Sequence, residues 1–336
     1  MADGVRTGIV GATGAVGAEL LAILAERQFP VGELRLLASA RSGGTTLRFR
    51  GREHPVAEAT PQSFAGLDLV LFSAGADRSR ALAPAALDAG AFVVDNSSAF
   101  RNDPAIPLVV PEINGALLDA KPRLVANPNC TTIVFLMPFA PIHRQVPCRE
   151  AVFASYQAVS GTGAAAMAEL EAQTRAWAAR EPAPAPSVYP KPIAFNVLPL
   201  VGELDADGVS SEEAKGQQET RKILGDPSIH VSCTCVRVPT WRAHAVAARV
   251  WPERAVTVDE VRAWIDAAPG VRCVPRDVAC GPTPQEAAGL DDVLVGRLRV
   301  SASPRPALSF FACGDQLRKG AALNAIQIAE RLLGVA

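Results

Sequence analysis

The sequence has no excess of charge of either sign: 33 Lys and Arg residues stand against 34 Asp and Glu residues, for a formal net charge of −1. A nucleic-acid-binding protein would carry a basic excess, so that class is excluded, whereas a local basic pocket for a small anion is still allowed. No stretch approaches the ~18 uninterrupted apolar residues of a membrane-spanning helix, so we expect no membrane contact. The remaining composition, 49% hydrophobic and 20% charged, is typical of a globular protein.

Cysteine is sparse and unpaired in pattern. The seven cysteines are an odd number, and none forms a C-x-x-C pair. Together with the lack of a signal peptide, this predicts reduced thiols and a cytoplasmic location. We predict no metal site. A length of 336 residues predicts two domains.

The stretch Asn127–Thr132 is the most informative part of the sequence. It lies between two apolar runs, and Pro128 with Asn129 is typical of a tight turn, so strand, turn and helix are expected in that order. Cys130 would then lie at or near a helix N-terminus, where exposed N–H groups and the helix dipole favour a thiolate. The pattern indicates a nucleophile, and a buried structural cysteine is the alternative.

The N-terminal segment has the pattern of a nucleotide-binding turn. Residues 5–10 have the pattern of a buried strand and precede glycines at positions 11, 14 and 17, and a helical pattern follows over 18–26. Glycines here let a backbone approach a phosphate that the helix N-terminus then binds. The spacing is G-x-x-G-x-x-G rather than G-x-G-x-x-G, so a simple tight turn stays possible. The next strand, 34–38, ends in Ser39, Arg41 and Ser42 with no acid, which favours NADP over NAD unless Arg41 is only a solvated loop charge.

Strands at 68–75 and 91–95 alternate with helices at 18–26 and 78–89, which predicts a right-handed parallel sheet. Ligands bind at the carboxyl ends of such strands, so Arg101, in the loop after the 91–95 strand, is either an anion ligand or a surface arginine. Residues 107–114 are expected to be a short extended run. Five prolines within 181–192 predict an ordered crossing or a flexible loop.

The second half offers two further candidate pairs. Glu212 and Lys215 lie three residues apart at the start of a helix over 212–224, where the residues alone indicate a surface ion pair. Arg237 and His244 flank the turn between strands at 230–238 and 245–250, so they are expected to lie close together. His244 is one of only four histidines and is the one beside a candidate anion-binding arginine. A final amphipathic helix is predicted over 317–333.

These pieces, taken in order, resemble the bacterial aspartate-semialdehyde dehydrogenase family from one end of the chain to the other. The matching segments are GATGAVG (11–17), LASARSGG (37–44), LFSAGADRS (71–79), VVDNSSAFR (93–101), LVVPEIN (108–114), NPNCTT (127–132), YQAVSGTG (156–163), PIAFNVLP (192–199), SEEAKGQQET (211–220), CVRVPTWRAH (235–244) and LRKGAALNAIQIAE (317–330). Small departures are Thr131-Thr132, where Ser-Thr is common, and Trp241-Arg242, where smaller residues are frequent.

The resemblance implies a role for each matching residue. Cys130 matches the nucleophile and His244 the acid/base. Gln157 and Glu212 match residues that hold the amino end of the substrate, Arg237 matches the ligand of its carboxylate, and Arg101 and Lys215 match phosphate ligands. The resemblance thus replaces the surface ion pair as the interpretation of Glu212 and Lys215. The implied cofactor residues are Gly11, Thr13, Gly14, Ala15, Val16, Ser39, Arg41, Ser42, Ser160, Gly161 and Asn324.

The implied reaction converts L-aspartyl-4-phosphate and NADPH to L-aspartate-4-semialdehyde and phosphate, in lysine, threonine, methionine and diaminopimelate biosynthesis. The chemistry suits the residues independently. A thiolate both attacks an acyl phosphate and leaves again, cations hold the released phosphate, and a histidine can move a proton near neutral pH.

The implied architecture is α/β. A Rossmann-type NADP-binding domain over 1–128 takes back a C-terminal helix at 315–336. An α+β catalytic and dimerisation domain over 129–314 has a mixed sheet like that of the glyceraldehyde-3-phosphate dehydrogenase C-terminal domain. A homodimer or homotetramer is implied. The alternatives are an N-acetyl-γ-glutamyl-phosphate reductase, whose acylated amine would give Glu212 no cation to bind, and a catalytically silent NADP-binding paralogue.

Overall fold

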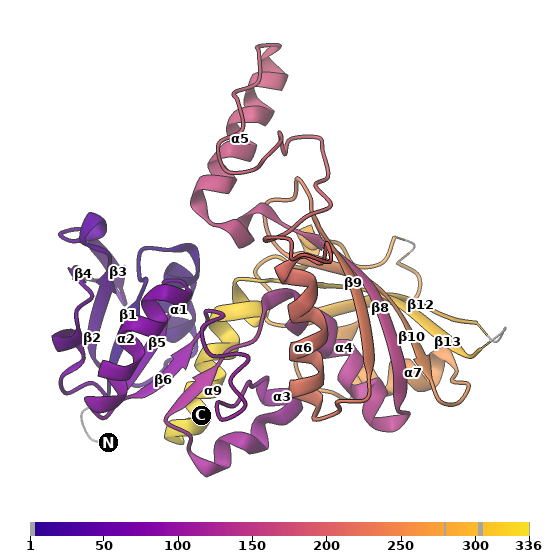
Figure 1. Ribbon diagram of the computed structural model, residues 1–336, viewed down its shortest axis with the longest axis horizontal. Helices are drawn as coiled ribbons and strands as arrows, with labels where there is room; N and C mark the ends of the chain where they lie inside the picture. Colours follow the sequence, from indigo (N-terminus) through magenta and orange to yellow (C-terminus); the bar gives the residue numbers. More distant parts are fainter. Residues whose placement is uncertain (1–3, 279, 302–304, 336) are drawn as a thin grey trace. The chain divides into compact units, whose positions relative to one another are not determined.

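The computed structural model describes residues 4–278, 280–301 and 305–335, and they form two compact units (Figure 1). The first unit comprises Met1–Asn129 with Ala321–Ala336, and the second comprises Cys130–Gly320. The chain therefore returns to the first unit at Ala321, a few residues after the expected position of 315.

The first unit is built on a seven-stranded sheet in the order β3-β4-β2-β1-β5-β6-β7. Its neighbouring strands are parallel except for the β3–β4 pair. This confirms the predicted Rossmann-type arrangement. The elements are β1 (Val5–Val10), α1 (Ala15–Glu26), β2 (Val31–Ala38), β3 (Thr46–Phe49), β4 (Arg52–Glu58), β5 (Leu69–Phe72), α2 (Ala76–Asp88), β6 (Phe92–Asp95), α3 (Pro111–Asn114), β7 (Leu124–Ala126) and α9 (Leu323–Leu333).

Two expectations for this unit were wrong in detail. The sheet is not purely parallel, because an unpredicted hairpin of β3 and β4 adds an antiparallel edge strand. Residues 107–114 are not extended throughout, because Pro111 begins the short helix α3 after a single bridge at Leu108. Proline is favoured at the first position of a helix, since its missing N–H would have no partner there.

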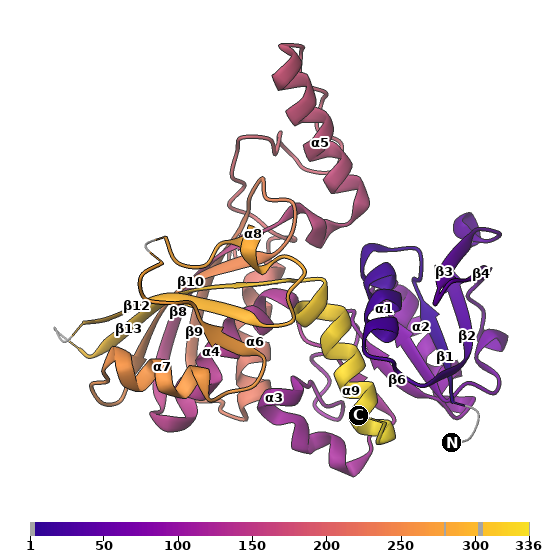
Figure 2. The ribbon, with the colours of Figure 1, turned by 180° about the vertical axis from the view of Figure 1, so that it is seen from behind.

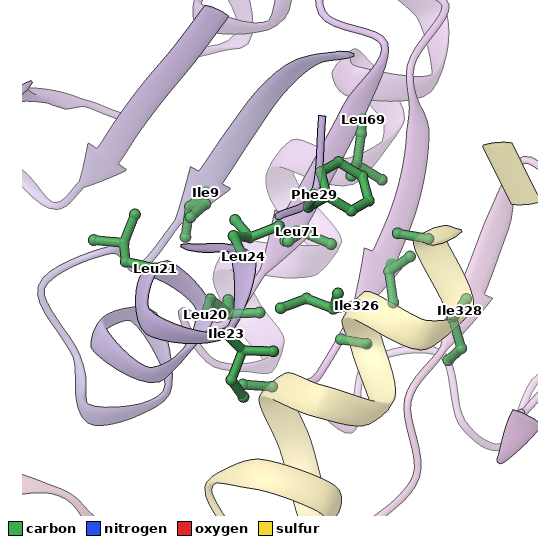
Figure 3. Packing of buried hydrophobic residues seen from close by; sticks show 14 of the residues in the cluster. Ile9, Leu20, Leu21, Ile23, Leu24, Phe29, Leu69, Leu71, Ile326 and Ile328 are labelled. Carbon is green, nitrogen blue, oxygen red and sulfur yellow. The ribbon is translucent and has the colours of Figure 1, made fainter. Parts of the chain in front are cut away.

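The core of the first unit explains why the C-terminal helix returns to it. Leu20 and Leu24 of α1 are fully buried, as are Ile326 and Ile328 of α9, and all four belong to one apolar cluster (Figure 3). Burial of such side chains is worth about 1.5–3 kcal/mol each. Residues far apart in the sequence thus share one core against the seven-stranded sheet.

The second unit is built on a six-stranded sheet in the order β11-β12-β13-β10-β8-β9. The β8–β9 and β11–β12 pairs are parallel and the other pairs antiparallel, so the sheet is mixed, as predicted. The elements are α4 (Cys130–Gln145), β8 (Cys148–Gln157), α5 (Ala164–Ala179), α6 (Ser211–Leu224), β9 (His230–Arg237), β10 (His244–Pro252), α7 (Val258–Asp266), β11 (Val271–Cys273), α8 (Pro284–Ala287), β12 (Val293–Ser301) and β13 (Ala307–Gly314).

One face of this sheet is packed and the other is open. On the packed face, Phe135 of α4 stacks on Phe153 of β8 at 4.6 Å and also faces Phe310 of β13. On the other face, Val152 and Tyr156 of β8 are 38% and 39% exposed. Exposed apolar side chains on an open sheet face, here with Arg249 beside Val152, are typical of an interaction surface.

The proline-rich stretch is tied to α5, which projects away from the sheet of its own unit (Figures 1 and 2). Buried Glu169 accepts hydrogen bonds from the backbone N–H groups of Ser187 and Val188, at 2.6 and 2.7 Å. Gln173 accepts from the N–H groups of Ile193 and Ala194, both at 3.0 Å. Side chains of α5 thus satisfy the loop backbone, which agrees with an ordered crossing.

The predicted final helix is in fact two pieces. A π-helix, Arg318–Ala322, comes first, and the regular helix α9 follows it. Single π turns often occur at functional sites. Among the described residues, no helix is long and apolar enough to cross a membrane.

Candidate functional site

The glycine turn of the first unit has the geometry of a phosphate-binding turn. Gly11 has φ +90, and a Cβ there would lie 2.3 Å from the carbonyl oxygen of Ser73. A Cβ on Gly17 would lie 2.4 Å from the oxygen of Gly11. Neither position can hold a side chain, so strand β1 and helix α1 approach each other closely here. Helix α1 begins at Ala15 with no side-chain cap, which leaves its first N–H groups available to an anion.

A cavity of about 330 Å³ lies directly against this turn. Gly11, Thr13 and Gly14 line one part of it, and Ser39 and Arg41 at the end of β2 line another. The structure thus brings together the two stretches from which the sequence predicted a dinucleotide site, and these residues fit a phosphate-bearing ligand. Arg78 of α2 also lines the cavity, and sequence reasoning missed it because nothing in a helical pattern marks which arginine faces inward.

The other predicted cofactor residues are divided between the two units. Ala15 and Val16 begin α1, and Ser42 lies 3.5 Å from Thr13, measured between their hydroxyl oxygens. Asn324 of α9 is fully buried, and its amide donates to the Val109 carbonyl oxygen and to Oδ1 of Asn127, at 2.9 and 2.7 Å. Ser160 and Gly161 lie in the second unit, in a 3₁₀ turn over Val159–Thr162.

Arg101 is a buried residue rather than a surface arginine. Its Nε donates to the backbone oxygen of Asn127 at 2.9 Å, and Nη2 donates to the backbone oxygen of Asn96 at 2.7 Å. These bonds tie the loop after β6 to the residues just before Cys130. Its guanidinium is therefore held in a fixed orientation.

Cys130 is the first residue of α4, as predicted, and it is half-buried. The following helix is buried from Thr131 to Ile142, which fixes its position firmly. A Cβ on Gly320 would lie 3.0 Å from the Cβ of Cys130, so a side chain at position 320 would crowd Cys130. Burial by contrast raises the pKa of Cys148 and of Cys273 to about 12, so those thiols are inert.

Gln157, Glu212 and Lys215 form a hydrogen-bonded chain. The Gln157 amide donates to Oε1 of Glu212 at 3.1 Å, and Nζ of Lys215 donates to Oε2 at 3.0 Å. Glu212 is only 9% exposed, so this is not the surface ion pair that the residues alone indicated. Ser210 caps α6 through the N–H of Glu213, which sets where the helix begins and which way Glu212 faces.

Arg237 and His244 lie together, as the strand pattern predicted. A Cβ on Gly161 would lie 3.3 Å from Nη1 of Arg237 and 3.3 Å from Nε2 of His244, so all three line one small space. Arg237 also donates to the Ala158 oxygen at 2.6 Å, and the ring of Tyr189 lies 6.0 Å from its guanidinium carbon. The strand register pairs Arg237 with Gln157, which joins this space to the Gln157–Glu212–Lys215 chain.

The orientation of the His244 ring is fixed by the backbone. The Ala158 N–H donates to Nδ1 at 3.1 Å, so in the neutral ring the proton lies on Nε2. Within the described parts of the chain, buried Nε2 has no hydrogen-bond partner. Burial, together with the nearby Arg237 guanidinium, lowers the pKa of His244 from 6.5 to about 3. A neutral ring thus directs a polar atom into the space beside Gly161.

We expect this low pKa to make stability depend on pH. Between pH 6.5 and 3 the unfolded chain binds a proton at His244 that the folded chain does not. The free energy of unfolding that the neutral ring contributes is therefore complete above pH 6.5. Below that pH it falls by about 1.4 kcal/mol per pH unit. In urea unfolding from pH 7 to 5, the stability of the wild type should fall more steeply than that of His244→Asn. Parallel curves for the two proteins would contradict a buried neutral ring.

The fold and these side chains define a two-unit, dinucleotide-dependent dehydrogenase, and the comparisons with known proteins agree. The family model described as semialdehyde dehydrogenase, NAD binding domain, matches residues 6–120, and that described as semialdehyde dehydrogenase, dimerisation domain, matches residues 139–319.

The curated relatives give a narrower family. An aspartate-semialdehyde dehydrogenase of Synechocystis sp. is 46% identical over 99% of this chain and 98% of the relative. One of Streptomyces akiyoshiensis is 46% identical over 97% of each. A crystal structure of aspartate semialdehyde dehydrogenase II from Vibrio cholerae, complexed with ASA, is 40% identical with a TM-score of 0.93 over 99% of each chain. The chain belongs to the aspartate-semialdehyde dehydrogenase family.

Proposed function

We propose that this chain catalyses the NADPH-dependent reductive dephosphorylation of L-aspartyl-4-phosphate to L-aspartate-4-semialdehyde through a thioester on Cys130. The observation that carries the proposal is the placement of Glu212. A buried carboxylate held between an amide and an ammonium, beside Arg237, supplies an anion for a substrate amine and cations for two substrate anions. The charges of the substrate match this set in sign.

The first step is acyl transfer to sulfur. The Cys130 thiolate attacks the acyl carbon, a C–S bond forms, and the C–O bond to phosphate breaks. Cys130 begins α4, so the first N–H groups of this helix stabilise the thiolate and the oxyanion that develops on attack. The released phosphate carries its charge to Lys215 and Arg101.

The other end of the substrate is held by the remaining polar groups. Glu212 and Gln157 bind the α-ammonium, and Arg237 binds the α-carboxylate as a charge-assisted pair. Arg237 is 6% exposed, and it is held by the Ala158 oxygen and the Tyr189 ring, so its orientation is set before substrate arrives. The reacting carbon is thereby directed toward Cys130.

The second step reduces the thioester, and the bound NADPH supplies the hydride. His244 presents Nε2–H to the small space beside Gly161. From there it donates a hydrogen bond to the oxyanion and exchanges a proton with the reacting group as the intermediate collapses to aldehyde and thiolate. Ser160 and Gly161 lie in the same turn and would contact the nicotinamide end of the cofactor.

The cofactor is NADPH, held by the cavity of the first unit. The glycine turn, with Thr13, Ala15 and Val16, would hold the pyrophosphate. Ser39, Arg41 and Ser42 would hold the 2′-phosphate, and buried Asn324 would be a further cofactor contact. The cavity wall at the end of β2 carries a guanidinium and hydroxyls and no carboxylate, which is the donor set that a 2′-phosphate requires.

Arg41→Ala should weaken NADPH binding by roughly tenfold or more while NADH binding changes less than about twofold, since one charged hydrogen bond to the 2′-phosphate is lost. Fluorescence titration of both cofactors measures this, with exposed Arg52→Ala as the matched control. Equal losses for the two cofactors would remove Arg41 from the 2′-phosphate site.

Lys215→Ala should raise the KM for phosphate in the reverse reaction by roughly tenfold, and the KM for the aldehyde by much less, because Lys215 is assigned to the phosphate. Lys222→Ala, on the same helix, is the control. If only the aldehyde KM rises, Lys215 belongs to the other end of the substrate.

The substrate assignment is tested by phosphate-dependent NADP reduction with two aldehydes side by side. Turnover of L-aspartate-4-semialdehyde alone is expected. Turnover of N-acetyl-glutamate-5-semialdehyde instead would make the chain an N-acetyl-γ-glutamyl-phosphate reductase and leave Glu212 without its ammonium. NADP binding with neither aldehyde turned over would favour a silent paralogue.

We further propose a cytoplasmic homodimer, itself able to pair into a homotetramer. The open sheet face carries the exposed apolar side chains of Val152 and Tyr156, with Arg249 beside Val152, and it belongs to the unit whose family model is described as a dimerisation domain. The first unit would bind the dinucleotide, and the second would carry catalysis and assembly. Light scattering of the purified protein tests the assembly, and a monomer at micromolar concentration would contradict it.

A further inference from the structure

The backbone immediately before His244 is strained. Ala243 is fully buried and has φ +69, a conformation that residues with a side chain rarely adopt. Strained positions of this kind persist only where the surrounding structure holds them, and they cluster at functional sites. The contacts that hold this turn therefore bear directly on where the His244 ring lies.

Asp315 and Gln316, which follow strand β13, accept hydrogen bonds from this turn. Arg242 Nε donates to Oδ2 of Asp315 at 2.6 Å, and the Ala243 N–H donates to Oε1 of Gln316 at 2.8 Å. The Gln316 amide also donates to the hydroxyl of Ser160. Hydrogen bonds thus join the turn before His244 to the segment that follows strand β13.

Asp315 accepts most of the hydrogen bonds in this region. Its carboxylate is fully buried and accepts from the N–H groups of Gly289, Leu317 and Arg318, at 2.6, 2.9 and 3.3 Å. A buried carboxylate with so many donors is firmly fixed, and the Arg242 guanidinium balances its charge. A carboxylate held in this way fixes the position of the residues bonded to it and does not itself react.

The same segment reaches the nucleophile. The Asp315 backbone oxygen accepts from the N–H of Gly320 at 3.0 Å. Gly320 in turn packs against Cys130, where a Cβ would lie 3.0 Å from the cysteine Cβ. One run of six residues therefore contacts the turn that carries His244 at one end and Cys130 at the other.

We propose that Arg242 and Asp315 are a positioning pair that holds the His244 ring at its working distance from Cys130. The inference rests on the proposed roles of Cys130 and His244 and adds two residues to which no role was assigned. Neither side chain touches substrate in this scheme. Both act through the backbone of Ala243 and through the 315–320 segment, where a misplacement of about 1 Å can cost ~10² in rate.

The test compares Arg242→Met, Arg242→Lys and Asp315→Asn, with Arg149→Met as control. Arg149 pairs with Glu253 at 2.8 Å on the surface of the same unit, and the Arg149 side chain is 85% exposed. We expect Arg242→Met to lower kcat by ~10–100-fold with KM values and NADPH affinity within about twofold. Arg242→Lys should recover part of this rate, and the control should not change it.

The pH profile separates positioning from a purely structural role. The groups that face His244 are Arg237 on β9, Glu212 on α6 and the Ala158 N–H. If the turn loosens, water reaches the ring and its pKa moves back toward its ordinary value. A new acidic limb should then appear in the kcat profile of Arg242→Met, as it would not after simple loss of stability.

Asp315→Asn keeps the size and one acceptor oxygen, so it tests the pair if Arg242→Met does not fold. It should lower kcat similarly, and the double variant should be no worse than either single one, because both remove the same contact. Normal kcat in folded single variants, with only a lowered Tm, would overturn the inference. Absence of aspartate-semialdehyde turnover in the wild type would instead count against the proposed function.

Discussion

Cys130→Ser should lose at least ~10²-fold in kcat while it still binds NADPH with near-normal affinity. A neutral hydroxyl is a far poorer nucleophile than a thiolate and a poorer leaving group from the acyl intermediate. Serine is nearly isosteric, so the close packing against Gly320 is kept and the loss reports chemistry rather than folding. Steady-state kinetics with cofactor titration on the same preparation measure both quantities.

The other cysteines provide the controls. Cys280 is exposed, and Cys280→Ser should keep wild-type turnover. Burial raises the pKa of Cys148 and Cys273 to about 12, so neither can substitute as a thiolate at neutral pH. Near-normal turnover by Cys130→Ser would remove Cys130 from the mechanism.

His244→Asn should lower kcat by ~10²–10³-fold, the usual range for loss of a positioned acid/base group. The ring is fully buried, its Nδ1 accepts from the Ala158 N–H, and its Nε2 faces the space shared with Arg237. Asparagine is too short to place a donor there. The loss should appear in kcat and kcat/KM together, because the interaction is made in the transition state.

The control for this variant is His54→Asn, in the β4 strand of the other unit, which should leave turnover unchanged. Iodoacetamide alkylation of Cys130 at several pH values then reports whether His244 also affects the thiol. A variant that retains more than a tenth of the wild-type kcat would assign the proton transfer to another group.

Much of this architecture was predictable because the patterns are local. Val5–Val10 formed a largely buried strand just before the glycine turn, and Cys130 began a helix because Pro128 and Asn129 end the strand before it. The capping box of Ser210 and Glu213 is likewise formed by residues close together in the chain. Each of these features is decided within a few residues.

What could not be predicted depends on register between distant segments. Glu212 and Lys215 alone have the pattern of a surface pair, and only the packing of α6 beside Gln157 buries Glu212 and covers part of Lys215. The β8–β9 register sets Gln157 opposite Arg237, and no spacing in the sequence contains that register.

Two further features lacked any usable signal. The β3–β4 hairpin was missed because much of it is exposed and polar, so it shows no clear apolar alternation. The strained turn at Ala243 was missed because alanine gives no indication of a positive φ. Its partners Asp315 and Gln316 are about seventy residues away along the chain.

The most direct test of the account is to trap the acyl group on the enzyme. In the reverse direction, L-aspartate-4-semialdehyde and NADP are mixed with protein in the absence of phosphate, so the oxidised substrate has no acceptor after hydride loss. We predict a burst of NADPH equal to the enzyme concentration and a mass increase of one aspartyl group on the peptide that contains Cys130. Both the adduct and its release by added phosphate should be absent in Cys130→Ser. An adduct on another residue, or a burst without an adduct, would contradict the thioester mechanism.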